Sequence, residues 1–128
     1  MAIAKSHPRL KVTITIDNVA LEEHIDVDEE MEPDAVVKYI EAVSSAEFSL
    51  DFDVSHPWPH QSLMLDIFID GKRVRGALIN QEDFSGIVTK RAVQGVNYSK
   101  HGEWFLQKFC FSDLVVGKPS YRDEITAY

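Results

Sequence analysis

The stretch Ser62–Ile79, SLMLDIFIDGKRVRGALI, predicts a β-hairpin and decides the fold class. Every second residue from Leu63 to Ile69 is leucine or isoleucine, which gives an extended strand one apolar face. Asp70-Gly71 then supplies residues that tolerate the positive φ angles of a tight turn. Met64 and Phe68 lie on the opposite face of the first strand, so we expect that strand to be partly buried on both sides and central in its sheet.

The same period-two alternation recurs along the chain. It is clear in residues 10–17 (LKVTITID) and 47–54 (EFSLDFDV), where apolar side chains alternate with polar ones. Residues 86–93 are rich in β-branched side chains, and residues 19–27 predict a short strand after an Asp17-Asn18 turn. Several short strands separated by turn signals are typical of a β-sandwich.

The last clear strand is EWFLQKFCF, residues 103–111, in which both alternating sets carry apolar side chains. The set that begins at Phe105 is the richer in aromatic residues, so we expect it to form the core face. Trp104 follows the KHGE turn and is expected to cover one end of the core. Cys110, the single cysteine, is expected to be buried as a small apolar side chain.

Residues 33–45 fit two patterns. A helical stripe behind a proline is formed by Val36, Tyr39, Ile40 and Val43. Alternation also fits the segment VVKYIEAV, in which Val37, Tyr39 and Glu41 oppose Val36, Lys38 and Ile40. The β-branched content favours a strand, with a short helix near 34–43 as the alternative. The expected fold is thus an all-β antiparallel sandwich or jelly roll of about seven or eight strands.

The expected organisation is one domain. Residues 1–9 form an N-terminal arm, residues 10–116 the β-sandwich, and residues 117–128 a polar tail or edge strand. The net charge of −8 argues against a nucleic-acid partner, because phosphate contacts need a positive surface. No apolar run is long enough for a membrane span and no signal-peptide pattern is visible, so we expect an intracellular protein of the cytoplasm or nucleus.

Four segments in a fixed order resemble a fungal protein family of unknown function: VTITIDNVALEEH, YIEAVSSAEFSLDF, LMLDIFIDGKRVRGALI and WFLQKFCFSDLVV. The resemblance covers roughly residues 10–116. It implies a β-sandwich and no established catalytic residues. Ala46 stands where that family tends to have glycine, and a further strand is expected after FSDL.

The loop SHPWPH, residues 55–60, holds the first candidate binding residues. His56 and His60 are four apart, but the two prolines between them forbid the helix that would bring them to one face as metal ligands. Trp58 is held by those prolines either as a lid on the core or as an exposed anchor for a ligand. No metal site is expected here.

A second candidate is the basic group Lys72, Arg73 and Arg75 beside the Asp70-Gly71 turn, which could face the acidic run of residues 21–34 in another molecule. No catalytic motif and no cofactor-binding motif is present. We therefore expect a non-enzymatic interaction or self-assembly module, which contacts a protein partner or another copy through an edge strand. The alternative is a jelly roll that binds a small ligand or glycan through residues 55–60.

Overall fold

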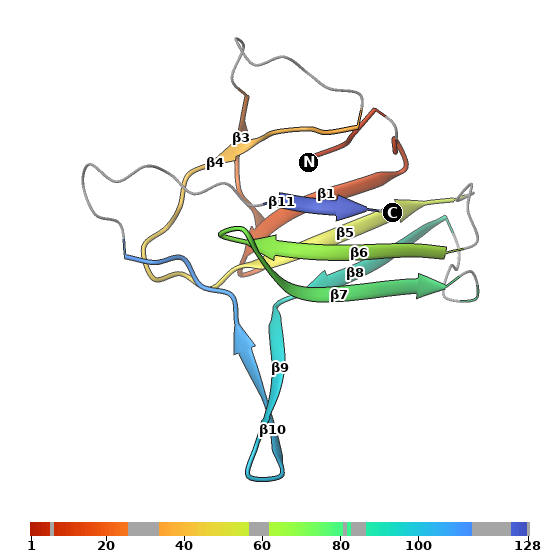
Figure 1. Ribbon diagram of the computed structural model, residues 1–128. Helices are drawn as coiled ribbons and strands as arrows, with labels where there is room; N and C mark the ends of the chain where they lie inside the picture. The colour runs from red at the N-terminus through yellow and green to blue at the C-terminus, as the bar shows by residue number, and fades with distance from the viewer. Residues whose placement is uncertain are drawn as a thin grey trace.

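The computed structural model describes residues 1–5, 7–25, 34–56, 62–80, 82 and 87–113, and the backbone of residues 124–127. The described part is nearly all β and contains no helix, which confirms the predicted fold class (Figure 1). Accordingly, none of the described segments is a helix that could span a membrane. The strands are β1 (Leu10–Ile16), β2 (Val19–Ala20), β3 (Glu23–His24), β4 (Tyr39–Ile40), β5 (Ser49–Ser55), β6 (Ser62–Ile69), β7 (Lys72–Asn80), β8 (Val88–Val93), β9 (Gly95–Lys100), β10 (Glu103–Lys108) and β11 (Glu124–Ala127).

Two antiparallel sheets form the body of the molecule, and they lie one over the other in Figure 1. One has the order β2-β1-β5-β8 and the other the order β11-β6-β7. β6 lies between β11 and β7, so the prediction that this strand is central is confirmed. β11 extends the second sheet on the far side of β6 from β7.

The core lies between the two sheets and comes from the alternating positions seen in the sequence. One set of side chains on β5 and one set on β6 are almost completely buried. Residues from β1, β7 and β8, from the segment just before β5 and from the segment after β10 complete it, giving a cluster of Leu10, Phe48, Leu50, Phe52, Val54, Leu63, Leu65, Ile67, Ile79, Val93 and Phe109. The side chains on the other faces of β5 and β6 are half-buried or exposed, in keeping with period-two alternation.

Three tight hairpin turns have the backbone that the sequence predicts. Asp17 and Asn18, Asp70 and Gly71, and His101 and Gly102 all have positive φ angles. Two consecutive positive φ values match the right-handed twist of the strands on either side. The turns join β1 to β2, β6 to β7 and β9 to β10.

The alternative of a short helix near residues 34–43 is wrong. Tyr39–Ile40 forms the short strand β4, which pairs antiparallel with β3. This pairing supplies backbone hydrogen-bond partners in the extended form, which outweighs the helical spacing of the apolar residues.

β9 and β10 form a separate two-stranded ribbon that projects from the body of the molecule (Figure 1). β8 ends at Val93 and β9 begins at Gly95, so the chain leaves the four-stranded sheet within two residues. The ribbon is the most distinctive departure from a plain sandwich, and the candidate interaction surface lies on it.

Candidate interaction surface

The base of the ribbon is held by backbone hydrogen bonds on both sides of Phe109. The Phe109 amide donates to the Gln94 carbonyl (2.8 Å), and the Phe48 amide donates to the Phe109 carbonyl (3.0 Å). The rings of Phe48 and Phe109 stack with their centroids 5.6 Å apart, and Phe111 packs on Phe48 at 4.6 Å. Phe109 therefore anchors the ribbon in the core.

Gly95 permits the close crossing of the two strands at this base. A Cβ at residue 95 would lie 2.7 Å from the carbonyl carbon of Gln107 and 2.8 Å from the Cα of Lys108, which is too close for any side chain. The Gly95 carbonyl also accepts a hydrogen bond from the Arg75 guanidinium (3.1 Å). Arg75 thus ties β7, in one sheet, to the point where the ribbon leaves the other.

Beyond its base, the ribbon carries apolar side chains on both of its faces. Tyr98 lies opposite Phe105, and their rings stack at 5.4 Å. Trp104 and Leu106 lie on the other face, opposite Ser99 and Asn97. These four apolar side chains are exposed: Trp104 by 76%, Leu106 by 44%, Tyr98 by 44% and Phe105 by 41%.

The prediction that Trp104 covers the core is therefore wrong. The alternation predicts a strand correctly, but this strand lies outside the two main sheets and, among the described strands, pairs with β9 alone. The prediction that the set beginning at Phe105 forms a core face is wrong at Phe105 itself. It is confirmed further along the chain, where Phe109 is buried and Phe111 half-buried. Apolar side chains on both faces fit a buried central strand equally well, so the alternation of this strand does not distinguish the two cases.

Cys110 is exposed, so the prediction that it is buried is also wrong. Its thiol donates to the Ser45 carbonyl (3.3 Å) at the base of the ribbon. Because Phe109 turns into the core, its neighbour Cys110 points outward, as period two requires.

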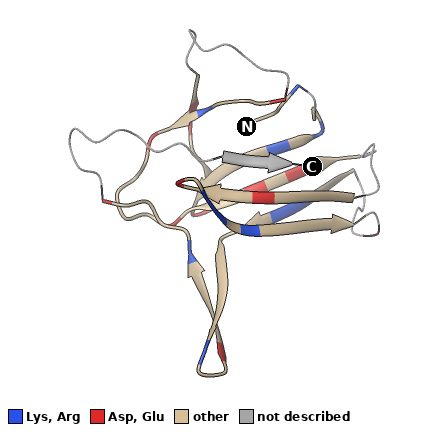
Figure 2. Cartoon of the chain, viewed as in Figure 1, with Lys and Arg blue, Asp and Glu red and all other residues tan. Residues whose placement is uncertain are grey.

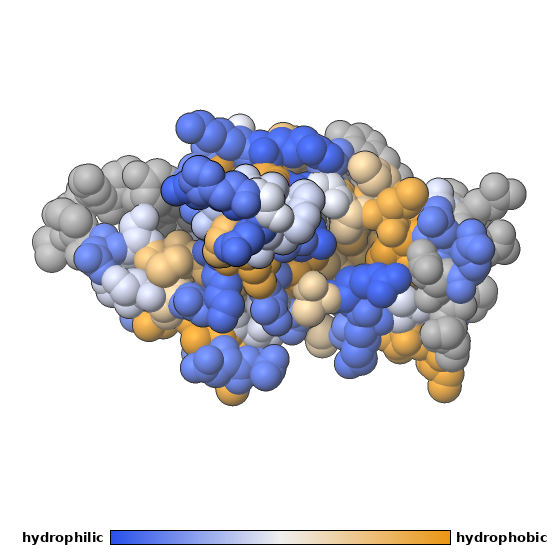
Figure 3. Space-filling model, turned by 90° about the horizontal axis from the view of Figure 1, so that it is seen from below, coloured by the Kyte–Doolittle hydropathy of each residue, from blue (hydrophilic) through white to orange (hydrophobic). Residues whose placement is uncertain are grey.

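Figure 3 views the molecule from the side toward which the ribbon projects. Hydrophobic atoms are exposed there among hydrophilic ones. The ribbon itself, residues 95–108, contains two lysines and one glutamate, whereas the rest of the chain has 20 acidic and 11 basic residues. Figure 2 shows its charged residues at the tip and the base. The ribbon is thus an apolar and weakly basic element on an acidic body.

The predicted site in residues 55–60 is described only in part, because Trp58 and His60 lie outside the described residues. His56 is half-buried at the end of β5, and its Nε2 lies 2.8 Å from the Thr89 hydroxyl on β8. Its amide donates to Ile87 (2.9 Å), and its carbonyl accepts from Arg9 (3.0 Å). These contacts give His56 a role in joining β5 to its neighbours.

The basic residues Lys72, Arg73 and Arg75 do not form one patch. Arg73 pairs with Asp66 (2.9 Å) and lies over Gly76 on the outer face of its sheet. Arg75 lies opposite the buried Ile67 and reaches inward to Gly95. Lys72 is exposed beside the turn. The structure therefore separates the three side chains that the sequence grouped.

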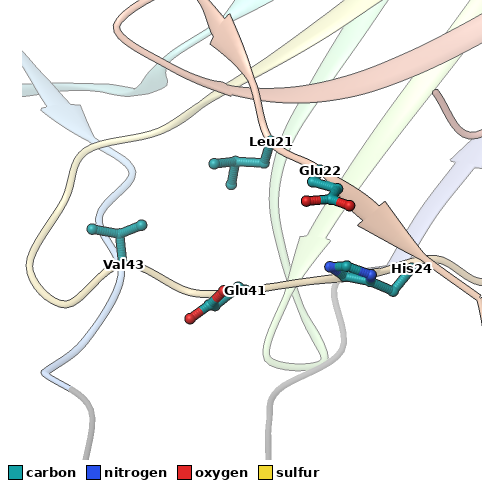
Figure 4. A pocket seen from close by; sticks show the side chains of 5 residues that line it. All are labelled: Leu21, Glu22, His24, Glu41 and Val43. Atoms are coloured by element: carbon teal, nitrogen blue, oxygen red, sulfur yellow. The ribbon is translucent and has the colours of Figure 1, made fainter.

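A shallow hollow of about 150 Å³ lies between β3 and the segment after β4. Its lining residues, seen in Figure 4, are Leu21, Glu22, His24, Glu41 and Val43. Pockets for small organic ligands usually hold about 300–1,000 Å³, so this hollow is too small for one. Within the described ranges, no three His, Cys, Asp or Glu side chains gather as metal ligands.

Comparison with known proteins identifies one family. No curated protein and no solved structure matches the chain. A family described as a domain of unknown function (DUF7918) matches residues 9–126, which includes the ribbon and both sheets except for Ala127, the last residue of β11. The match extends beyond residue 116, where the resemblance seen in the sequence ended, and its description names no activity. The chain belongs to the DUF7918 family of domains of unknown function.

Proposed function

We propose that this chain is a non-enzymatic protein-interaction module and that the β9–β10 ribbon is the element that binds the partner. The observation that carries the proposal is the exposure of Tyr98, Trp104, Phe105 and Leu106 on an element that projects from the body. Tryptophan and tyrosine are enriched among the residues that dominate binding energy at protein interfaces.

The energetics of the ribbon support a bound state. A two-stranded hairpin alone is only marginally stable in water, because neither of its faces is covered. The apolar side chains of this ribbon lie on both faces. A partner that covers them would gain about 25 cal/mol of binding free energy per Å² of apolar surface removed from water. Binding would therefore stabilise the ribbon as well as the complex.

A protein partner fits this surface better than a nucleic acid. Lys108 already pairs with Glu47 (3.3 Å), and Lys100 lies opposite Glu103 across the ribbon. Few of the ribbon's charges are available to phosphates, and the chain as a whole carries −8.

The test compares three purified proteins. They are the natural chain, the double variant Trp104→Ser with Leu106→Ser, and the control Leu78→Ser, which changes an exposed apolar residue of β7. Each is used to capture proteins from native extract, and every enriched protein is then purified and titrated. We expect at least one partner, a second copy included, whose affinity falls at least about tenfold with the ribbon variant. The control should bind that partner normally.

Thermal unfolding of the three proteins distinguishes recognition from folding. The replaced side chains are exposed, so the melting temperatures should nearly coincide. Partners that bind all three proteins equally would contradict the proposed role of the ribbon.

A further inference from the structure

One edge of the ribbon is available for strand pairing. Within the described ranges, β10 has β9 as its only strand neighbour, in a register from Glu103 opposite Lys100 to Lys108 opposite Gly95. The backbone groups on the other edge of β10 point outward, and such an edge is a template for another strand.

The side chains of β10 are arranged symmetrically about Phe105. Trp104 and Leu106 flank it, and the polar residues Glu103 and Gln107 flank those. A two-fold axis at Phe105 places Phe105 opposite its own counterpart and every other residue opposite its mirror position, so apolar residues meet apolar ones and polar residues meet polar ones.

We propose that the partner is a second copy of this chain, and that the two β10 strands pair antiparallel about a two-fold axis at Phe105. This inference rests on the proposed function of the ribbon. Phe105 then lies opposite Phe105 of the second copy, and Trp104 lies opposite its Leu106. Tyr98 already stacks on Phe105 at 5.4 Å, so a row of four aromatic rings crosses one face of the joined ribbons. Glu103 lies opposite Gln107, so no like charges are opposed.

Other registers form fewer apolar pairs. An axis at Leu106 would place Trp104 opposite Lys108 and Phe105 opposite Gln107. The two Leu106 side chains would then form the one apolar pair. Pairing through β9 at Tyr98 would place Asn97 opposite Ser99. Each favourable cross-strand pair contributes roughly 0.2–1 kcal/mol, so the Phe105 register with three apolar pairs is preferred.

Antiparallel pairing also keeps the two acidic bodies far apart, which limits the electrostatic repulsion between them. Each chain carries −8, and because its ribbon carries two lysines and one glutamate (+1), its body carries −9. Lys108 at the base lies three positions along the strand from Phe105, and the two bodies lie at opposite ends of the pair, so their bases are about 20 Å apart. The Debye length is about 8 Å at physiological salt, so the repulsion is largely screened.

The first test measures molar mass by analytical ultracentrifugation at concentrations up to about 100 µM, because an interface this small is expected to be weak. Cys110→Ser is the background, since an exposed thiol could cross-link copies by itself. We expect the mass to rise with concentration toward twice 14.5 kDa. Phe105→Glu should hold it at one chain, because two carboxylates would face each other, while Leu78→Glu should leave it unchanged.

The second test determines the register by cysteine cross-linking in the same background. Directly opposed residues have Cα atoms about 4.5–5.5 Å apart, within the range of a disulfide. Phe105→Cys should therefore form a covalent dimer on mild oxidation. Leu106→Cys should not, because the two residues at position 106 lie diagonally at about 7–8 Å.

A mass of one chain at every concentration would overturn this inference. Cross-linking at position 106 without cross-linking at 105 would overturn it too. Neither result would decide the proposed function. That function is tested by whether the double variant Trp104→Ser with Leu106→Ser loses binding to a different protein.

Discussion

β5 and β10 arise from similar sequences and have opposite environments. EFSLDFDV (47–54) and EWFLQKFC (103–110) both begin with glutamate and an aromatic residue and continue with alternation. In β5, Phe52 is completely buried, whereas in β10 Trp104 is 76% exposed. β5 lies between β1 and β8 and faces a second sheet, while β10 pairs with β9 alone among the described strands. Alternation thus predicts an extended strand, and its neighbours decide whether the apolar face is buried.

The largest contrast is expected from truncating one aromatic ring in each strand. Phe52→Ala leaves a cavity in a packed core and should lower the free energy of unfolding by about 3–5 kcal/mol. Phe105→Ala removes one cross-strand contact and should cost less than about 1 kcal/mol. Urea unfolding measures both, and equal losses would contradict the distinction between core and ribbon.

The junction between the two regions is the next position to test. Gly95→Ala forces a Cβ against the backbone of Gln107 and Lys108 and should cost about 1–3 kcal/mol. Asn97→Ala, an exposed change two residues further along β9, is the control and should stay within about 0.5 kcal/mol. If Gly95→Ala unfolds at the same urea concentration as the control, the close crossing at the base is not required.

Two arginines of β7 provide a smaller contrast. Arg75→Met keeps an apolar stem but removes the donor to the Gly95 carbonyl, and should cost about 1–2 kcal/mol. Arg73→Met breaks a more exposed ion pair with Asp66 and should cost about 0–1 kcal/mol. Denaturant unfolding of the two variants should rank them in this order, and the reverse order would show that Arg75 does not brace the ribbon.

The smallest effect is expected at Asp113, next to the ribbon's base. The Ser45 and Ser44 hydroxyls both donate to its carboxylate, and these hydrogen bonds lower its pKa from 3.8. A lowered pKa in the folded state adds stability above the ordinary pKa, and this stability is lost as the pH falls through the folded value.

Asp113→Asn should therefore lower the urea midpoint slightly near neutral pH. The difference from the natural chain should shrink as the pH falls below 3.8. A difference that is constant down to about pH 2 would show that the charge of Asp113 is not responsible.

Local signals predicted the body of the fold well. The turn at Asp70-Gly71 and the central position of β6 follow from turn chemistry and from apolar residues on both strand faces. Much less of the candidate surface could be predicted. The prediction that Trp104 covers one end of the core is wrong, and the strand's two apolar faces gave no warning, since they fit a buried central strand as well as an uncovered ribbon.

The sequence by itself determined that this chain forms antiparallel strands joined by tight turns, because alternation and positive-φ residues act over a few neighbouring positions. Only the tertiary structure decided which apolar faces meet. Burial depends on contacts between residues far apart in the chain, such as Leu50 on β5 with Val93 on β8. The departure of the ribbon at Gly95 and the separation of Arg73 from Arg75 are results of that long-range packing.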